Sequence, residues 1–352
     1  LRKAPKRLLD PMGPLSIPPT YALSIAPWML RFWRASWRDR YQASMQAQAQ
    51  LMALSRAAVE RQIDLAKGEP LIQREGQLQL FEGAGDFAAS LTIWRLSREL
   101  GLRFDLLDSP RAIAEIQPGL DPRFTHAGYT PDWSNTCDPA RWRAHLTEQF
   151  LARGGQTDRA HVTALEPATD HVRLRCDGRT ALQARQVIVA AGAWSHHLAR
   201  TLGDRIPLET ERGYNTTLPP GAFDLRTHLT FGGHGFVVSR INGGIRIGGA
   251  VELGGLALPP NFKRADTLLD KSATFMPGLD TSGGTQWMGF RPSLPDSLPV
   301  IDVSPRSNRV IYAFGHGHLG LTQSAGTADL VNDLVAGRSP QIDMRPFSAS
   351  RF

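Results

Sequence analysis

The chain has 352 residues, of which 41% are hydrophobic and 21% charged, and it carries a formal net charge of +7. This is an ordinary globular composition with enough length for two domains, which excludes a disordered or fibrous chain. The sequence contains no run of about 18 apolar residues, so we expect no transmembrane helix. With Cys137 and Cys176 as its two cysteines, a disulfide framework is excluded and a reducing compartment is favoured.

The first residues read as the middle of a longer protein. Leu1 is not methionine, and residues 1–7 show neither the apolar region nor the small-residue cleavage site of a signal peptide. Residues 1–40 carry eight basic and two acidic residues. The basic residues are interleaved with Trp28, Phe32, Trp33 and Trp37.

Such a basic and aromatic face has two interpretations. It lies on an anionic membrane surface, or its tryptophans pack inward beneath solvated arginines. Residues 28–41 are therefore a hypothetical peripheral membrane contact, and the expected location is the cytoplasm or the inner face of the plasma membrane. No nucleic-acid recognition motif accompanies the charge, so nucleic acid is not an expected partner.

The helices are predicted from composition, caps and breakers. Residues 11–27 are rich in proline and glycine and are predicted to be a linker or loop. Helix formers then dominate up to residue 67, which predicts one long helix or two that break near Trp37. Residues 125–135 are predicted to be a loop. Further helices are expected at 86–100, 139–152 with Asp138 as N-cap, 262–275 and 321–336.

Strands are predicted where short apolar or alternating runs lie between turn residues. They are expected at 71–82 around Gly76, and at 160–166, 171–176, 186–191, 236–239, 245–247 and 309–314. The run at 187–191 is apolar on both faces, as in a buried parallel strand. Gly243-Gly244 predicts a hairpin turn within an antiparallel block spanning residues 206–256.

The glycine-rich segment Gly315-His-Gly-His-Leu-Gly320 has the spacing G-x-G-x-x-G between a strand and a helix. It is not the first unit of a Rossmann fold, because no second strand ending in an acidic residue follows it. The loop either brings backbone N–H groups and a helix N-terminus to a ligand or is a tight turn relieved by glycine. His316 and His318 lack neighbouring carboxylates or thiolates, so no metal site is predicted.

Two further segments have both a chemical and a structural interpretation. In Val187 to Ser195, small residues after a strand let the backbone approach a flat ligand, or they simply end the strand. In Gly289-Phe-Arg-Pro, the arginine stands between a glycine-terminated strand and a proline. Its planar fork suits a carboxylate, so Arg291 is a candidate anchor for one, or else a structural ion-pair partner.

Five motifs follow one another along the chain. They are Ala-Ala-Gly-Ala-Trp-Ser (190–195), Glu-Arg-Gly-Tyr (211–214), Gly-Gly-Ile-Arg-Ile-Gly-Gly (243–249), Gly-Phe-Arg-Pro-Ser-Leu-Pro-Asp-Ser-Leu-Pro (289–299) and Phe-Gly-His-Gly-His-Leu-Gly-Leu-Thr (314–322). In this order they resemble the D-amino-acid dehydrogenase branch of the D-amino-acid oxidase and glycine oxidase superfamily. Residues 248–256 and 259–264 are similar to the enzymes of that branch that oxidise D-proline or hydroxy-D-proline. Asn215 and Asp302 depart from that pattern, since relatives often have histidine and glycine there.

The resemblance implies FAD as cofactor and a division of site residues between substrate and flavin. Arg291 would bind the substrate carboxylate, with Tyr214 and His316 as further catalytic candidates. The backbone of Val162 would contact adenine. The remaining candidates for cofactor binding are Ala191, Gly192, Ala193, Trp194, Gly315, Gly317, His318, Leu319, Gly320, Leu321 and Thr322.

The implied fold is of the α/β (α+β) class: a three-layer FAD-binding domain, incomplete at its N-terminus, interleaved with an antiparallel-sheet substrate domain. Residues 69–128 and 200–288 would form the substrate domain, and 129–199 and 289–352 the FAD-binding domain. Residues 1–68 would be a linker and long helices. The family's N-terminal βαβ unit, with its pyrophosphate-binding glycines, is expected to precede Leu1.

The implied activity is hydride transfer from the Cα–H of a D-amino acid, D-proline-like or hydroxy-D-proline-like, to FAD. Electrons would pass to a quinone or another respiratory acceptor. The alternatives are an oxidase of glycine, sarcosine or another secondary amine on the same fold, a non-catalytic remnant, and a membrane-binding module.

Overall fold

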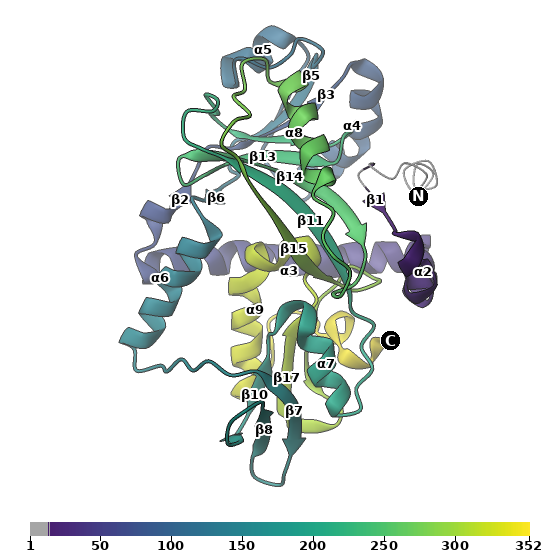
Figure 1. Ribbon diagram of the computed structural model, residues 1–352, viewed down its shortest axis with the longest axis vertical. Helices are drawn as coiled ribbons and strands as arrows, with labels where there is room; N and C mark the ends of the chain where they lie inside the picture. Colours follow the sequence, from purple (N-terminus) through teal and green to yellow (C-terminus); the bar gives the residue numbers. More distant parts are fainter. Residues whose placement is uncertain (1–12, 14) are drawn as a thin grey trace.

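The computed structural model describes Gly13 and residues 15–352. In Figure 1 a large twisted sheet occupies the upper part and two three-stranded sheets the lower part, and the long helix α3 (Arg38–Ala66) crosses the middle of the view. The basic residues of the first twelve positions, and three of the first four residues of the predicted linker at 11–27, lie outside the described residues. None of the described helices is both long and apolar enough to cross a membrane.

The predicted break near Trp37 is confirmed, because α2 (Ala22–Ala35) and α3 are separate helices. The predicted loop at 11–27 is wrong for its second half, since α2 begins before Pro27 and contains it. A proline this near the start removes one intrahelical hydrogen bond. Burial of Ile25 and Trp28 against Leu253 offsets that loss.

The large sheet has nine strands and is mostly antiparallel, with β3 parallel to β12 and β1 parallel to β14. Asn242 and Gly243 both have positive φ, as a tight hairpin between β13 and β14 requires, so the predicted hairpin is confirmed. In spatial order the strands are β15 (Thr285–Ser293), β11 (Glu209–Leu218), β14 (Gly244–Leu253), β13 (Phe236–Ile241), β12 (His228–Phe231), β3 (Gln77–Phe81), β5 (His126–Thr130) and β4 (Asp105–Leu107), with β1 (Leu15–Ser16) beside β14.

The loop predicted at 125–135 is wrong, because β5 pairs with both β3 and β4 there. Gly128, which read as a breaker, is needed because the indole of Trp94 packs against its Cα, where a Cβ would overlap the ring. Tertiary packing therefore determines this strand. A short antiparallel pair of strands continues from these two strands. It is formed by β2 (Ile72–Gln73), just before β3 in the sequence, and β6 (Asn135–Thr136), just after β5.

The lower part is built around β17 (Ser307–Phe314), which pairs with β16 (Val300–Ser304) and with β10 (Val187–Val189). The β10–β17 pair is parallel, as predicted, but β10 is an edge strand and Ile188 is 48% exposed. The expectation of burial on both faces is therefore wrong at Ile188. A meander of β7 (Val162–Pro167), β8 (Val172–Cys176) and β9 (Leu182–Ala184) lies next to this sheet.

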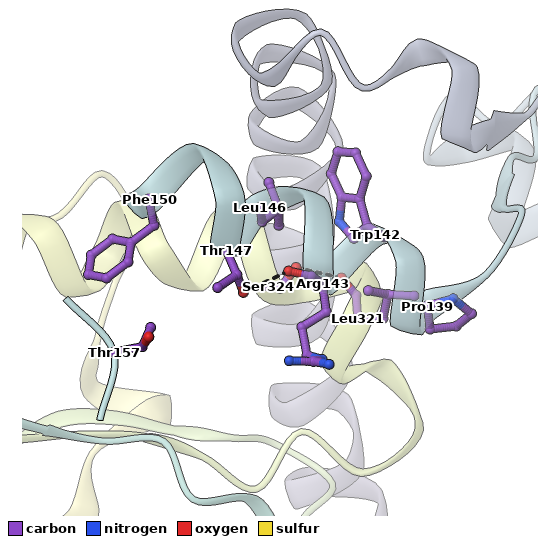
Figure 2. Close-up of a pocket in the computed structure, with 9 residues that line it drawn as sticks. All are labelled: Pro139, Trp142, Arg143, Leu146, Thr147, Phe150, Thr157, Leu321 and Ser324. Carbon is purple, nitrogen blue, oxygen red and sulfur yellow. Dashed lines mark hydrogen bonds between the residues drawn. The ribbon is translucent and has the colours of Figure 1, made fainter. Parts of the chain in front are cut away.

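Helices connect and cover these strands. The prediction for α6 (Pro139–Ala152) is confirmed at both ends, and the Asp138 Oδ1 atom accepts the Ala140 N–H at 2.7 Å. Figure 2 shows α6 lying across the start of α9 (Gly320–Val335), beside α3. Strand β15 runs across residues 288 and 289, where a domain boundary was predicted, and the division into domains stays a prediction.

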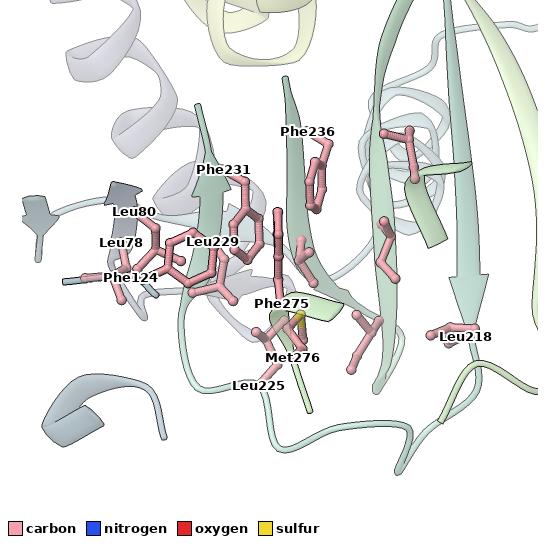
Figure 3. Close-up of a cluster of buried hydrophobic side chains, with 14 of the residues drawn as sticks. Leu78, Leu80, Phe124, Leu218, Leu225, Leu229, Phe231, Phe236, Phe275 and Met276 are labelled. Atoms are coloured by element: carbon pink, nitrogen blue, oxygen red, sulfur yellow. The ribbon is translucent and has the colours of Figure 1, made fainter. Parts of the chain in front are cut away.

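The main core lies on one face of the nine-stranded sheet, beneath α8 (Lys263–Phe275) and α5 (Pro110–Ile116). Helix α4 (Ala84–Glu99) packs on the other face, where Trp94 lies against Gly128. Figure 3 shows the aromatic centre of the core, where Phe124, Phe231, Phe236 and Phe275 stack or meet edge to face. Because side chains alternate along a strand, the residues between these core positions point to the opposite face of the sheet. That second face carries the candidate site.

Candidate functional site

A hollow of about 380 Å³ opens on the face of the large sheet that the core leaves uncovered. Its floor is formed by neighbouring strands, and one side chain reaches it from the glycine-rich loop before α9. The polar and aromatic residues around it are Tyr214, Asn215, Thr230, Phe236, Ser239, Arg246, Trp287, Arg291 and His318. Arg291, predicted as the carboxylate anchor, is therefore part of a cavity.

Arg291 is half-buried on β15, and its guanidinium crosses toward β14, where Nη1 donates to the Ala250 carbonyl at 3.2 Å. It passes over Gly213 of β11, where any Cβ would overlap the guanidinium. Burial lowers the pKa of Arg291, and the charge of Glu211 offsets part of that effect. Arg291 and Pro292 lie inside the strand rather than after its end, which is tolerated because β15 is an edge strand.

Glu211 was not found from the sequence, yet it joins the two halves of the site. It pairs with Arg291 across β11 and β15, and its Oε2 lies 2.6 Å from Nε2 of His318 in the glycine-rich loop. Burial raises the pKa of Glu211, but hydrogen bonds from His318 and Ser293 and the charges of His318 and Arg291 outweigh burial, so the pKa is lowered overall. No local pattern could reveal a contact between residues 107 positions apart.

Tyr214 contributes to the wall of the hollow, but its hydroxyl lies on the α8 side of the sheet. The hydroxyl donates to Glu252 Oε2 at 2.5 Å and accepts the Asn261 N–H at 3.0 Å. Arg212 extends this buried network by donating to Glu252 and to carbonyls of the loop after β14. The hydroxyl of Tyr214 is therefore not brought together with Arg291.

His316 is also placed away from the cavity. Its imidazole is buried, and its Nε2 lies 2.9 Å from Thr327 Oγ1, a residue of α9. Burial lowers the pKa of His316 to about 4, so the ring is neutral near pH 7. This environment suits a residue that fixes the loop against α9 more than one that transfers protons.

The predicted cofactor residues form two similar turns that both pack against β15. Gly192–Trp194 leads into α7 (Ser195–Thr201), and Gly317–Leu319 leads into α9. Glycines in both turns have positive φ. The ring of Trp194 lies 5.7 Å from that of Phe290, the residue before Arg291. The strand that carries Arg291 therefore also positions both glycine turns.

These turns fit a flat, electron-accepting ligand. Helix α9 has no acidic residue in its first turn and no side-chain cap, so its first N–H groups are available to an acceptor and the helix dipole favours negative charge. Trp194 and Leu321 are 51% and 46% exposed and offer apolar surface beside these turns.

The remaining cofactor candidates differ in what they can offer. Val162 is half-buried as the first residue of β7, and Ala191 is exposed. The side chain of Ala193 is buried, which leaves its backbone for contact. Leu321 lines a second hollow of about 360 Å³ between α6 and α9, with Trp142, Leu146 and Phe150 opposite it (Figure 2). Thr322 is exposed in the first turn of α9.

Within residues 15–352, no three histidine, cysteine, aspartate or glutamate side chains are grouped closely enough to hold a metal ion.

A sheet-based arginine pocket, joined through one strand to two glycine turns and a helix N-terminus, is the arrangement of a flavin-dependent oxidoreductase. Residues 25–334 match the family described as FAD dependent oxidoreductase, and the chain belongs to this family. FAD is accordingly its cofactor, and the predicted family, fold class and enzyme class are confirmed.

Relatives and solved structures agree with this assignment. A D-amino-acid oxidase of Bradyrhizobium diazoefficiens is 33% identical over 357 residues, which cover all of this chain and 84% of that protein. A D-amino acid dehydrogenase of Rhizobium johnstonii is 28% identical, over 99% of this chain and 85% of that protein. Glycine oxidase from Geobacillus kaustophilus superposes with a TM-score of 0.77 at 22% identity, covering 86% of this chain and 82% of that one.

Proposed function

We propose that this protein dehydrogenates a D-amino acid held in the Arg291 pocket. The observation that carries the proposal is the placement of Arg291, whose half-buried guanidinium lies in a cavity on the strand that also contacts both glycine turns. The names of the relatives, D-amino-acid oxidase and D-amino acid dehydrogenase, support a D-amino acid as the substrate.

Each residue has a task in this proposal. Arg291 would bind the α-carboxylate through two parallel hydrogen bonds and so fix the direction of the Cα–H bond. Glu211 and His318 would hold the arginine strand and the glycine-rich loop in register. FAD, when bound, supplies the electron acceptor for the Cα–H hydride. The N-terminus of α9 would stabilise negative charge on the group it faces.

The electron acceptor separates two versions of this function. In the dehydrogenase version, electrons pass to a quinone or another respiratory acceptor. The alternative is an amine oxidase acting on glycine or sarcosine, for which the superposition on glycine oxidase offers a fold-level precedent.

The test is anaerobic mixing of the FAD-loaded protein with D- and L-amino acids while the flavin absorbance is followed. We expect reduction by D-enantiomers, and faster reoxidation by a quinone than by oxygen. Reduction by glycine or sarcosine with fast reoxidation by oxygen would favour the oxidase. A folded protein that stays colourless after FAD addition would favour the non-catalytic alternative. D-Proline and hydroxy-D-proline, suggested by residues 248–264, belong in the first substrate set.

As a second proposal, we infer a peripheral membrane contact. Of the aromatic residues in the segment 28–41, only some are exposed and could take part in it. Trp28 and Phe32 stack on each other and pack inward, so they are not available to a membrane. Trp33 and Trp37 are 56% and 45% exposed and lie 5.2 Å apart at the corner between α2 and α3. Four arginines are close to this corner in the sequence, and Arg34 lies over the ring of Trp37. They are Arg31, Arg34, Arg38 and Arg40. Exposed indoles beside several arginines favour an anionic lipid surface.

A further inference from the structure

A second arginine lines the same hollow as Arg291 and has no assigned role. Arg246 lies on β14, and its Nε donates to Thr217 Oγ1 at 3.0 Å. It forms no salt bridge with any residue of the described chain, and Asp138 acts on it only as a longer-range charge. Burial lowers the pKa of Arg246. Its Nη atoms have no hydrogen-bond partner in the described part of the chain and are not buried, so the planar fork is available to a ligand in the hollow.

Arg246 and Arg291 point to the same face of the sheet. Ile245 and Ile247, its neighbours on β14, belong to the core on the other face, so Arg246 faces the hollow by alternation. Across the sheet, Ser239 of β13 is its direct partner and also lines the hollow. The end of the cavity remote from Arg291 is therefore cationic and polar.

Strand geometry gives the separation of the two guanidinium groups. The head of Arg291 lies over Gly213, whereas that of Arg246 is bonded to Thr217, four residues further along β11. Four residues of strand rise correspond to roughly 13 Å. The hydrogen bond from each guanidinium to a carboxylate oxygen takes about 3 Å of this distance, which leaves about 7 Å between the outer oxygens of the two carboxylates. An extended five-carbon dicarboxylate has approximately this reach, whereas a proline ring does not.

The middle of the hollow offers what such a ligand needs between its two ends. Asn215, on β11 between Gly213 and Thr217, is only 7% exposed, and its Oδ1 has no hydrogen-bond partner in the described part of the chain. This acceptor lies at the level where an α-amino group would be. Trp287 folds over Gly289, where a Cβ would overlap its ring, and so provides an apolar wall for a methylene chain.

We propose that Arg246 binds a second carboxylate, so that the pocket selects an acidic D-amino acid of the length of D-glutamate. This inference rests on the proposed function and names its substrate class. Arg291 takes the α-carboxylate, the Asn215 carbonyl accepts from the amino group, and Arg246 takes the side-chain carboxylate. D-Glutamine has the same shape without the charge, which makes it the matched comparison.

The experiment compares kcat/KM of the FAD-loaded protein for D-glutamate, D-glutamine, D-aspartate and D-proline. We expect D-glutamate to exceed D-glutamine by at least about tenfold, because the charge pair with the half-buried Arg246 is lost with the amide. Arg246→Leu should bring this ratio to about one, and Arg246→Lys should retain part of it. Arg173→Leu removes an equal charge at an exposed site on β8 and should leave the ratio unchanged.

A binding measurement separates this inference from the proposed function. Calorimetry with glutarate and butyrate needs no turnover, and glutarate should bind at least about tenfold tighter, through Arg246. Equal binding of the two acids, or preferred turnover of D-glutamine or D-proline, would overturn the inference and leave the proposed function intact. If no D-amino acid reduces the flavin while glutarate binding still depends on Arg246, the proposed function fails and the dicarboxylate site stands.

Discussion

The guanidinium of Arg291 lies directly over the Cα of Gly213 on the neighbouring strand. Only glycine leaves room there, because any Cβ would overlap the guanidinium. Gly213→Ala should therefore displace the carboxylate anchor and lower kcat/KM for the preferred D-amino acid by roughly 10- to 100-fold. The effect should appear mainly in KM.

Gly85→Ala is the matched control for this substitution. Gly85 lies in α4, and a Cβ there would meet nothing within 4 Å. This variant should keep its full activity and gain slightly in stability, since alanine favours helix. Wild-type KM in Gly213→Ala would show that the position of Arg291 does not set substrate affinity.

The Glu211 carboxylate should stabilise the folded protein in a pH-dependent way. Its folded pKa is lowered from the ordinary value of 4.5, so its stabilisation is fully present above that value and is lost as pH falls through the folded pKa. Glu211→Gln should lower the free energy of unfolding at about pH 7 and have a smaller effect at about pH 3.5. Urea unfolding at both pH values measures this difference, and an effect that does not change with pH would argue against a charged contact with His318 and Arg291.

Three partly buried histidines should make the stability of the fold decrease in a higher pH window. Burial lowers the pKa of His196, His228 and His316 from 6.5 to about 4. Between these values the unfolded chain binds more protons than the folded one, so the free energy of unfolding decreases as pH falls from 6.5 toward 4. His316→Gln should make this decrease shallower while leaving the pH profile of turnover near pH 7 unchanged. A new pH dependence of turnover near neutrality would instead indicate a proton-transfer role for His316.

Sequence patterns were sufficient where local chemistry determines structure. The Asp138 cap with Pro139 located α6. The Gly243-Gly244 signal located the hairpin, although its turn is at Asn242 and Gly243, one residue earlier. Sequence patterns failed where packing determines structure, as at β5, where Trp94 requires the bare Cα of Gly128. Strand β15 was missed as a continuous strand because Gly289 and Pro292, both inside it, are residues that commonly end a strand.

The candidate site shows the same division. Arg291 was predicted because it stands between a glycine and a proline and because it lies in a motif that resembles the family. Glu211 and Arg246 were missed because their significance comes from partners on other strands or in a distant loop. Tyr214 and His316 were predicted as site residues from their motifs, but hydrogen bonds to Glu252 and Thr327 hold their polar atoms away from Arg291.

The membrane proposal predicts that the exposed tryptophans drive binding to anionic vesicles. Trp33→Ala combined with Trp37→Ala should weaken co-sedimentation with phosphatidylserine vesicles by about tenfold or more, and salt should weaken the remaining binding. Trp133→Ala, which removes another half-exposed indole, is the control and should bind normally. Undiminished binding by the double variant would contradict a contact through this corner.

The most direct test of the central claim is flavin reduction by a D-amino acid and by its α-amide, in the wild type and in Arg291→Leu. If Arg291 anchors the α-carboxylate, the wild type should prefer the acid by roughly 100-fold or more, and the variant should treat acid and amide alike. Arg291→Lys should recover part of the preference, because a lysine keeps the charge without the planar fork. An Arg291→Leu protein that binds FAD and reduces it with the wild-type rate, affinity and preference for the acid would contradict the account.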